Sequence, residues 1–228
     1  MWGSSASPAH DALLLPSQPP DLPVHHVLGN HCLDLPKAAV LARLRAPAAG
    51  RYTVPLAPGW RLVGLDTTEM SGHSQEGPES AAAKEAAAFL AARPLSDDHP
   101  QMSPWNGGVG AGQLAWLQDE LAAAAAAGDR VVVAGHHQAG PGAAARRSHA
   151  AWNHDAIYAA LENSPARLYL AGHDHEGGYA AAGGVHWLTL EAICEAPPGS
   201  NAYAVLHFYG DRVVVEGVGA AVSRELAL

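Results

Sequence analysis

Three short apolar runs in this chain end in a glycine, and a histidine follows within two residues. They are Val24–Leu28 before Gly29-Asn30-His31, Arg130–Ala134 before Gly135-His136-His137, and Arg167–Ala171 before Gly172-His173-Asp174-His175. Such runs favour short buried β-strands, and we expect each glycine to let the backbone turn sharply as it leaves its strand. Ligand and metal sites of open α/β sheets lie beyond the carboxyl ends of the strands. The motifs therefore predict polar side chains that converge from different strands at one edge of a sheet.

Predicted helices alternate with these strands. The composition of Ser80–Arg93 favours a helix. In Gln113–Ala127 the leucines share one face, and Gly128 stands at the expected stop. The other predicted helices are residues 37–44 and 153–163, and the other predicted strands are 61–66, 185–190, 202–209 and 212–218, the last two forming a hairpin at Gly210-Asp211. This order predicts an α/β fold with a partly parallel sheet, finished by antiparallel strands.

Length and charge exclude several classes of protein. The chain has 228 residues, and its 13 Lys and Arg against 22 Asp and Glu give a formal net charge of −9. Because nucleic acids and anionic membranes need a basic face, we expect neither as a partner. No apolar run approaches the roughly 20 residues of a membrane span, and the first residues do not resemble a secretory signal. The two cysteines, Cys32 and Cys194, build no disulfide framework, so we expect a cytoplasmic protein.

The chain divides into two parts on composition. Residues 1–22 are rich in Ser, Pro and Ala and predict a flexible lead-in, because the prolines interrupt any helix. Residues 23–228 carry all the predicted elements and form one domain. The sequence leaves the oligomeric state open.

The histidine motifs point to metal chemistry. The chain has 14 His, more than its 13 Lys and Arg together, and neutral imidazole is the commonest protein metal ligand. An Asn oxygen with imidazole nitrogens suits Mn, Fe, Co or Zn. The Gly-His-Asp-His loop could present its two imidazoles to two adjacent ions, and pairs of ions roughly 3.5–4 Å apart serve phosphoester chemistry.

These motifs resemble the third, fourth and fifth motifs of the calcineurin-like metallophosphoesterases. Further segments resemble the manganese-dependent ADP-ribose/CDP-alcohol diphosphatase subfamily, its plant and algal branch above all. The resemblance runs from about Val24 to the C-terminus and implies a β-sandwich flanked by helices. The segments are residues 29–33, 65–73, Trp105-Asn106-Gly107-Gly108, 113–117, Ala151-Trp152-Asn153, Gly177-Gly178-Tyr179, Leu190-Glu191-Ala192 and Glu195-Ala196-Pro197-Pro198.

The resemblance also implies a reaction and site residues. The reaction is metal-dependent hydrolysis of the diphosphate bond in ADP-ribose, CDP-choline and related small nucleotides, with two ions, most readily Mn²⁺. Asn30, His136 and His173 would bind one ion and His175 the second. His31 would lie near the scissile phosphate, stabilising its charge or protonating the leaving oxygen.

Five more residues have open assignments. His137, Asn106 and Gly107 are candidates for contact with the substrate, although Asn106-Gly107 could be an ordinary loop. Asp66 and Glu69 could orient ligand histidines or cap a loop.

Two motifs that open the family pattern, Asp-x-His/Gln and Gly-Asp-x-x-Asp, do not precede Gly29. We therefore expect a domain without its first strands, an exposed strand edge, and a second ion held by His175 alone. Three explanations remain open: an incomplete chain, a splice form, or a degenerate relative. The alternative function is accordingly a truncated or degenerate isoform that binds nucleotide or a partner chain without efficient hydrolysis.

Overall fold

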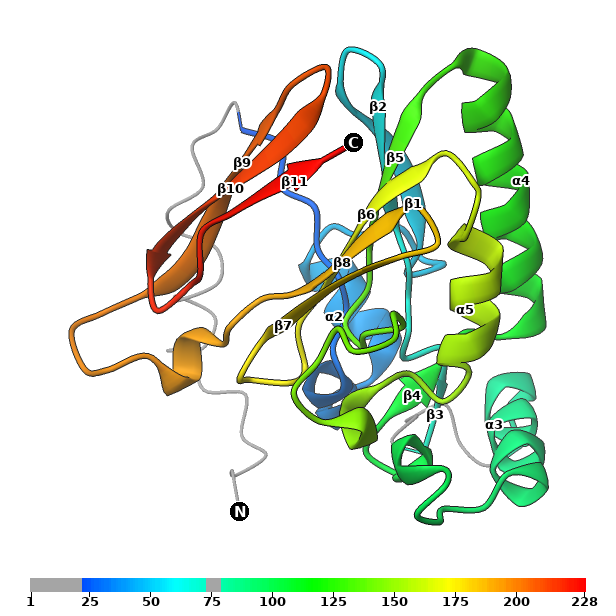
Figure 1. The fold of residues 1–228 in the computed structure, drawn as a ribbon. Helices are drawn as coiled ribbons and strands as arrows, with labels where there is room; N and C mark the ends of the chain where they lie inside the picture. Colours follow the sequence, from blue (N-terminus) through cyan, green and yellow to red (C-terminus); the bar gives the residue numbers. More distant parts are fainter. Residues whose placement is uncertain (1–21, 73–78) are drawn as a thin grey trace.

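The computed structural model describes residues 22–72 and 79–228. The predicted lead-in therefore lies outside the described residues, except for Leu22. A six-stranded mixed sheet, in the order β1-β2-β5-β6-β8-β7, forms the centre of the structure (Figure 1). Strands β2, β5, β6 and β8 are parallel, and β1 and β7 pair antiparallel at the two edges. The strands are β1 (Tyr52–Ala57), β2 (Trp60–Gly64), β5 (Arg130–Ala134), β6 (Ala166–Ala171), β7 (Gly178–Ala182) and β8 (Val185–Thr189).

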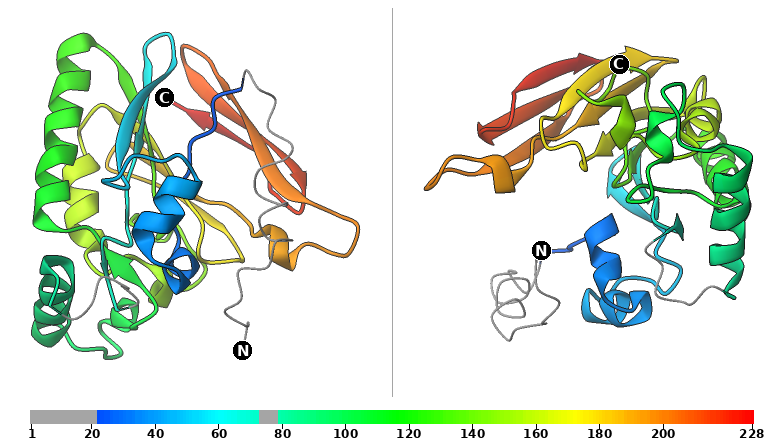
Figure 2. Two further views of the ribbon diagram at one scale, coloured as in Figure 1. Left: turned by 180° about the vertical axis from the view of Figure 1, so that it is seen from behind. Right: turned by 90° about the horizontal axis from the view of Figure 1, so that it is seen from below.

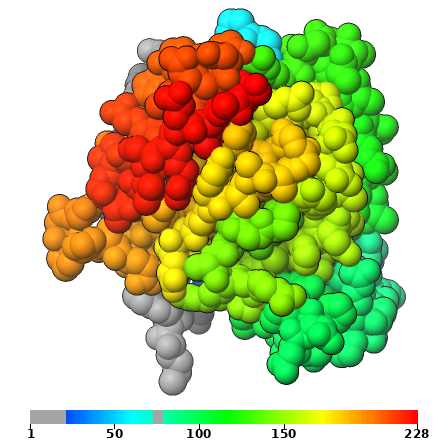
Figure 3. Space-filling model, in the orientation of Figure 1, coloured from blue at the N-terminus to red at the C-terminus, as the bar shows by residue number. Residues whose placement is uncertain are grey.

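A smaller antiparallel sheet packs against one face of this sheet. It consists of β9 (Ala202–Phe208), β10 (Arg212–Gly219) and β11 (Arg224–Ala227), in the order β11-β10-β9. Figure 3 shows these strands, orange to red, against the yellow strands β7 and β8. The layer between the sheets is apolar and contains Trp60, Val132, Leu168 and Leu188 from one side and Val213, Val215 and Leu226 from the other. The predicted β-sandwich and the hairpin of β9 and β10 are confirmed.

Helices cover the opposite face of the six-stranded sheet (Figure 1). Helix α4 (Ala111–Ala127) and α5 (His154–Leu161) bury Leu117, Leu121 and Ile157 against Val131 and Val133. Gly128 ends α4 in the left-handed conformation, with φ of 72°, which glycine adopts at little cost. The predicted stop is confirmed.

A third small core lies below these helices. Helix α3 (Ala81–Ala92) packs through Ala86 on Met70, Met102 and Trp152. The Ser80 side chain accepts a hydrogen bond from the N–H of Ala83 at 3.1 Å and so caps the helix. The paired strands β3 (Met70–Ser71) and β4 (Gly107–Gly108) adjoin this core.

Two short helical elements lie beside the carboxyl ends of the parallel strands. Both views of Figure 2 place η1 (Asn30–Asp34) and α2 (Lys37–Arg43), in blue, there. The other 3-10 turns are η2 (Pro100–Met102), η3 (Arg147–His149) and η4 (Ile193–Glu195). Across residues 22–72 and 79–228, none of the helices combines the length and the apolar character that a membrane crossing requires.

The structure differs from the strand predictions at six segments. The prediction of a strand at Val24–Leu28 is wrong, because no described strand pairs with it, although Leu28 is buried. The sequence did not predict strands β1, β3, β4, β7 and β11. Strand β1 contains Pro55, which an edge strand tolerates, and β7 has the sequence Gly-Tyr-Ala-Ala-Ala, without β-branched residues.

Strand β9 has an unpaired edge. Among the described strands it pairs with β10 alone. Tyr203 and Val205 on β9 are exposed. Whether a further strand of the family would pair here stays a prediction.

Candidate metal centre

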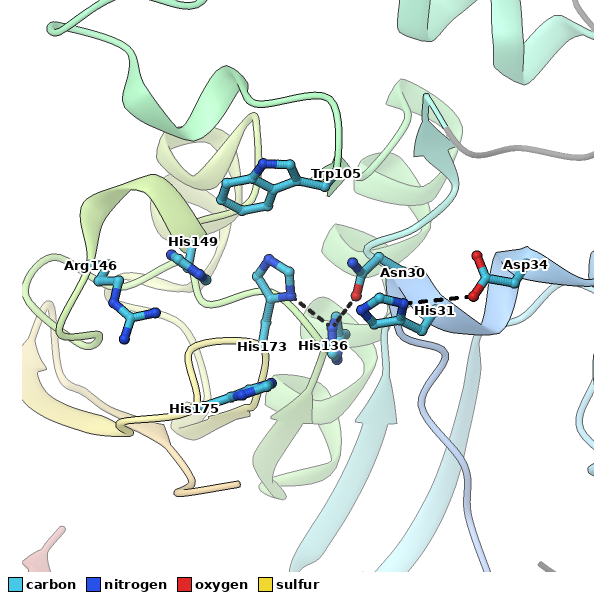
Figure 4. A pocket seen from close by; sticks show the side chains of 9 residues that line it. All are labelled: Asn30, His31, Asp34, Trp105, His136, Arg146, His149, His173 and His175. Atoms are coloured by element: carbon cyan, nitrogen blue, oxygen red, sulfur yellow. Dashed lines mark hydrogen bonds and ion pairs between the residues drawn. The ribbon is translucent and has the colours of Figure 1, made fainter. Parts of the chain in front are cut away.

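The predicted metal ligands and the predicted catalytic residue His31 meet in one cavity of about 420 Å³ (Figure 4). Strands β5 and β6 run parallel and end side by side, so the loops after them place His136 and His173 together. Segment η1 approaches these loops and adds Asn30 and His31. The cavity is lined by Asn30, His31, Asp34, Trp105, His136, Arg146, His149, His173 and His175.

Three of these side chains are in direct contact. Nε2 of His136 lies 3.0 Å from Oδ1 of Asn30 and 3.1 Å from Nδ1 of His173. Ligands about 2.1 Å from a divalent ion lie about 3.0 Å apart in octahedral and about 3.4 Å apart in tetrahedral geometry. The donor set, an amide oxygen and two imidazole nitrogens, suits a borderline divalent ion. These residues therefore fit a metal ion.

Burial keeps these imidazoles neutral. Together with a smaller effect of the neighbouring histidines, it lowers the pKa of His136 to about 4 and that of His173 to about 3. Metal ligation requires the unprotonated ring nitrogen. At neutral pH both side chains are thus ready to bind a cation without losing a proton first.

Close packing, rather than a turn, explains why glycine stands at two of the three positions that precede the histidine motifs. A Cβ on Gly29 would lie 2.9 Å from Cε1 of His136, and one on Gly135 would lie 2.5 Å from the hydroxyl of Tyr169. Gly29, Gly135 and Gly172 do not belong to the glycines with positive φ. The expectation that all three provide sharp turns is wrong: the left-handed residue is His173, with φ of 66°.

The neighbouring Asp174 stabilises this unusual turn. Its side chain is fully buried and accepts a hydrogen bond from the N–H of Arg146 at 2.7 Å. The N–H of Asp174 donates to the carbonyl of Gly172 at 2.8 Å. Because a left-handed histidine is strained, we infer that Asp174 helps to hold His173 over His136.

Two predicted site residues, the ligand candidate His175 and the catalytic candidate His31, lie at the rim. His175 is half exposed, and its Nδ1 lies 3.0 Å from Oε1 of Glu195. The His31 side chain is 88% exposed, and its Nδ1 lies 3.7 Å from Oδ2 of Asp34. Figure 4 shows His31 and His175 on different sides of the His136–His173 pair.

The residues predicted to contact substrate do not line the cavity. Asn106 is fully buried; its Nδ2 donates to the carbonyls of Gln101 and Ser148, and its Oδ1 lies 2.7 Å from Nε2 of His173. It positions His173 instead. Gly107 is buried in β4.

His137 does not line the cavity either. It is fully buried, with Nδ1 2.9 Å from the hydroxyl of Thr67, and burial holds its pKa well below the usual value. Its Nε2 has no hydrogen-bond partner in the described structure. The potential ligand atoms of His136, His137 and His173 lie within 4.8 Å of one another, so His137 stands beside the metal set rather than on the substrate side.

Asp66 and Glu69 cap backbone rather than orient histidines. Oδ1 of Asp66 accepts hydrogen bonds from the N–H and hydroxyl of Thr68. Oε2 of Glu69 accepts from the N–H of Gly110 at 2.8 Å. The loop-cap interpretation is confirmed by these contacts.

Sequence reasoning missed four residues of the cavity wall. Asp34, Trp105, Arg146 and His149 line it, with the Trp105 ring centroid 4.9 Å from that of His149 and 5.6 Å from that of His173. Trp105 stood in a recognised segment, but nothing local separated it from a core residue. Arg146 and His149 come from an irregular loop whose path depends on the tertiary fold.

Comparisons with known proteins agree with this geometry. The profile of the calcineurin-like phosphoesterase family matches residues 3–177. A manganese-dependent ADP-ribose/CDP-alcohol diphosphatase from Oryza sativa subsp. japonica is 34% identical, over 90% of this chain and 68% of the relative. A protein of the same name from Arabidopsis thaliana is 33% identical, over 86% of this chain and 67% of the relative.

A solved structure has the same fold. The crystal structure of a dimetal phosphatase from Danio rerio superimposes with a TM-score of 0.80 at 30% identity, covering 90% of this chain and 72% of the other. The sheet arrangement, the cavity at the strand ends and the family match lead to one conclusion. The chain belongs to the calcineurin-like phosphoesterase family.

Proposed function

We propose that this protein hydrolyses the diphosphate bond of small nucleotides such as ADP-ribose and CDP-alcohols with the help of Mn²⁺. The observation that carries the proposal is the contact of Asn30, His136 and His173 within one cavity. The Oryza sativa and Arabidopsis thaliana relatives named for this activity match 90% and 86% of the chain.

The buried residues of the cavity would hold and orient the metal. Asn30, His136 and His173 would hold one ion, and His175 would contribute to a second. Bound ions of this kind polarise phosphoryl oxygens and offset the charge that develops during hydrolysis. Asn106 fixes the ring of His173 through its Nε2, so that Nδ1 faces the cavity.

His31 is the proposed proton donor. Its ring stands exposed at the rim beside the Asp34 carboxylate. A protonated imidazole there can donate its proton to the leaving phosphate oxygen, and Asp34 can orient the ring. His31 is therefore the residue that we assign to the chemical step.

Trp105 and Arg146 are the proposed substrate-binding residues. The exposed face of Trp105 forms part of the cavity wall, and base–aromatic stacking contributes about 1–3 kcal/mol per base. Arg146 adds a positive charge for the diphosphate, although its guanidinium is also paired with Glu176. ADP-ribose carries adenine and CDP-alcohols carry cytosine, but both join a nucleobase to a diphosphate, and stacking tolerates either base, so one such wall can accept both.

Hydrolysis assays test the proposal. Purified protein with Mn²⁺ should convert ADP-ribose to AMP and CDP-choline to CMP, measured by chromatography. His31→Ala should lower kcat by about 10²–10⁴-fold, the usual contribution of a positioned acid. His207→Ala is the control, because His207 on β9 pairs with Glu216 on β10 and lies outside the cavity.

Calorimetry together with the hydrolysis assay tests the alternative that the chain binds nucleotide without hydrolysing it. If calorimetry shows that ADP-ribose binds while no AMP forms with Mn²⁺, the chain is a binding protein and the proposal of hydrolysis is wrong. The inner set, Asn30, His136 and His173, contains only neutral donors. This gives the outcome a physical basis, because a carboxylate ligand would strengthen the binding of divalent ions and this set has none.

A further inference from the structure

A second group of potential metal ligands lies at the rim of the cavity. His175 follows β6, whereas Cys194 and Glu195 belong to η4 after β8. The N–H of Ala192 donates to the carbonyl of His175 at 3.1 Å, which fixes η4 beside the His175 loop. One potential ligand atom from each of the three side chains lies within 4.8 Å of the others.

The separations fit the coordination of one small ion. Nδ1 of His175 lies 3.6 Å from Sγ of Cys194 and 3.0 Å from Oε1 of Glu195. In a tetrahedral zinc site, nitrogen and sulfur ligands lie about 3.5 Å apart, and nitrogen and oxygen ligands about 3.4 Å apart. Small side-chain rotations therefore suffice to place all three atoms on one ion.

The chemistry of the group differs from that of the inner set. Asn30, His136 and His173 are neutral donors, whereas Cys194 and Glu195 would supply a thiolate and a carboxylate. These two charges balance those of a divalent ion, and the thiol releases its proton when it binds. A thiolate also selects softer ions such as Zn²⁺ over Mn²⁺.

We propose that His175, Cys194 and Glu195 form a binding site for a thiophilic divalent cation, Zn²⁺ or Cd²⁺, at the rim of the cavity. All three side chains are exposed, so the ion reaches them directly from solvent and a fourth position stays open. At this site His175 binds the rim cation in place of the second Mn²⁺ named above, so the inference rests on the proposed function only in treating His175 as a metal ligand, and it requires no hydrolysis.

Cobalt substitution tests the site, because a Co²⁺–thiolate bond has a charge-transfer absorption in the near ultraviolet. Titration of the full chain with Co²⁺ should produce this band, and excess Zn²⁺ should remove it. Cys194→Ser should abolish the band, and Glu195→Gln should lower the affinity about tenfold or more. Circular dichroism verifies that the variants are folded, which we expect because both side chains are exposed.

Two further variants separate this proposal from the proposed function. Cys32→Ser should keep the band, because Cys32 accepts a hydrogen bond from the N–H of Gly29 on η1 and lies outside the group. His136→Ala should also keep it while losing the inner ion. The absence of a band in the wild-type chain, or its persistence in Cys194→Ser, contradicts the rim site whatever the outcome of the hydrolysis assays.

Discussion

His136 has little freedom to move. Asn30 and His173 contact its Nε2, and the backbone of Gly29 passes close against the ring. At the residue scale, the site therefore depends on small side chains and buried amides as much as on the ligands themselves.

Gly29→Ala should weaken metal binding without unfolding the protein. The new Cβ would meet the His136 ring at 2.9 Å, so the ring must shift, and we expect about a 10–100-fold loss of Mn²⁺ affinity in calorimetry, as when a supporting contact is removed. Gly112→Ala is the control, because no atom lies within 4 Å of its Cβ position on α4. Equal affinities of the two variants would contradict the packing argument.

Asn106→Ala should act on the metal rather than on substrate binding. It removes the contact at Nε2 of His173 and leaves the carbonyls of Gln101 and Ser148 without their buried donor. We expect a 10–100-fold lower Mn²⁺ affinity, with an unchanged KM for ADP-ribose at saturating metal. A higher KM with unchanged metal affinity would restore the substrate-contact interpretation.

The stability of the metal-free protein should decrease as the pH falls below about 6.5. Unfolded histidine has a pKa near 6.5, whereas burial lowers the pKa of folded His136 to about 4. Between these values the unfolded state binds more protons than the folded state. The free energy of unfolding therefore decreases as the pH decreases, and it reaches its full value above pH 6.5.

Urea unfolding with chelator present measures this effect. The difference in unfolding free energy between about pH 7 and about pH 4 should be smaller for His136→Gln than for the wild type, since the variant removes one such group. Identical pH dependence of the two proteins would show that His136 is not held neutral by the fold.

The sequence predicted the ligand candidates better than their surroundings. Glycine and histidine after an apolar run mark a strand end, and strand ends of a parallel sheet meet in space, so His136, His173 and His175 could be predicted to converge. Asn106 and Asp174 act through contacts with residues far away in the sequence, and no local pattern encodes those. Their roles required the tertiary structure.

At the scale of elements, η1 and α2 bring Asn30 and His31 to the strand ends. A salt bridge fixes this segment: Nζ of Lys37 lies 2.5 Å from Oδ2 of Asp66, which is fully buried after β2. The short helix itself buries little, because Leu41 is its one buried residue. The ion pair is therefore an important attachment of α2.

Lys37→Met should destabilise the protein by about 3 kcal/mol, because it leaves the Asp66 carboxylate buried without its cation. Urea denaturation measures the loss. Lys84→Met is the matched control: its pair with Glu79 is largely exposed, and such pairs contribute at most about 1 kcal/mol. Equal effects of the two substitutions would mean that α2 is held by other contacts.

Long, periodic elements were predictable, and short edge elements were not. Helix α4 follows its predicted range almost to the residue because leucine spacing and Gly128 both mark it. Strands β1 and β7 are stable only because each pairs with a strong neighbour. The apolar run at Val24–Leu28 shows the opposite behaviour. It has strand propensity, but it pairs with none of the described strands and therefore forms no strand.

At the scale of the whole molecule, the two-sheet architecture places the cavity. Parallel β5 and β6 end side by side, α4 and α5 support one face of the sheet, and β9, β10 and β11 cover the other. This leaves the carboxyl end of the sheet for the loops that carry the histidines. The position of the cavity thus follows from the burial of both faces of the sheet.

The central claim is that Asn30, His136 and His173 hold a divalent ion. Equilibrium dialysis of the purified chain against Mn²⁺, with the bound metal counted by mass spectrometry, tests it most directly. We predict bound Mn²⁺ in the wild type, its loss in His136→Ala with the circular dichroism spectrum retained, and normal binding in His207→Ala. A folded wild-type chain without Mn²⁺, or a His136→Ala variant that binds it equally well, would contradict the claim.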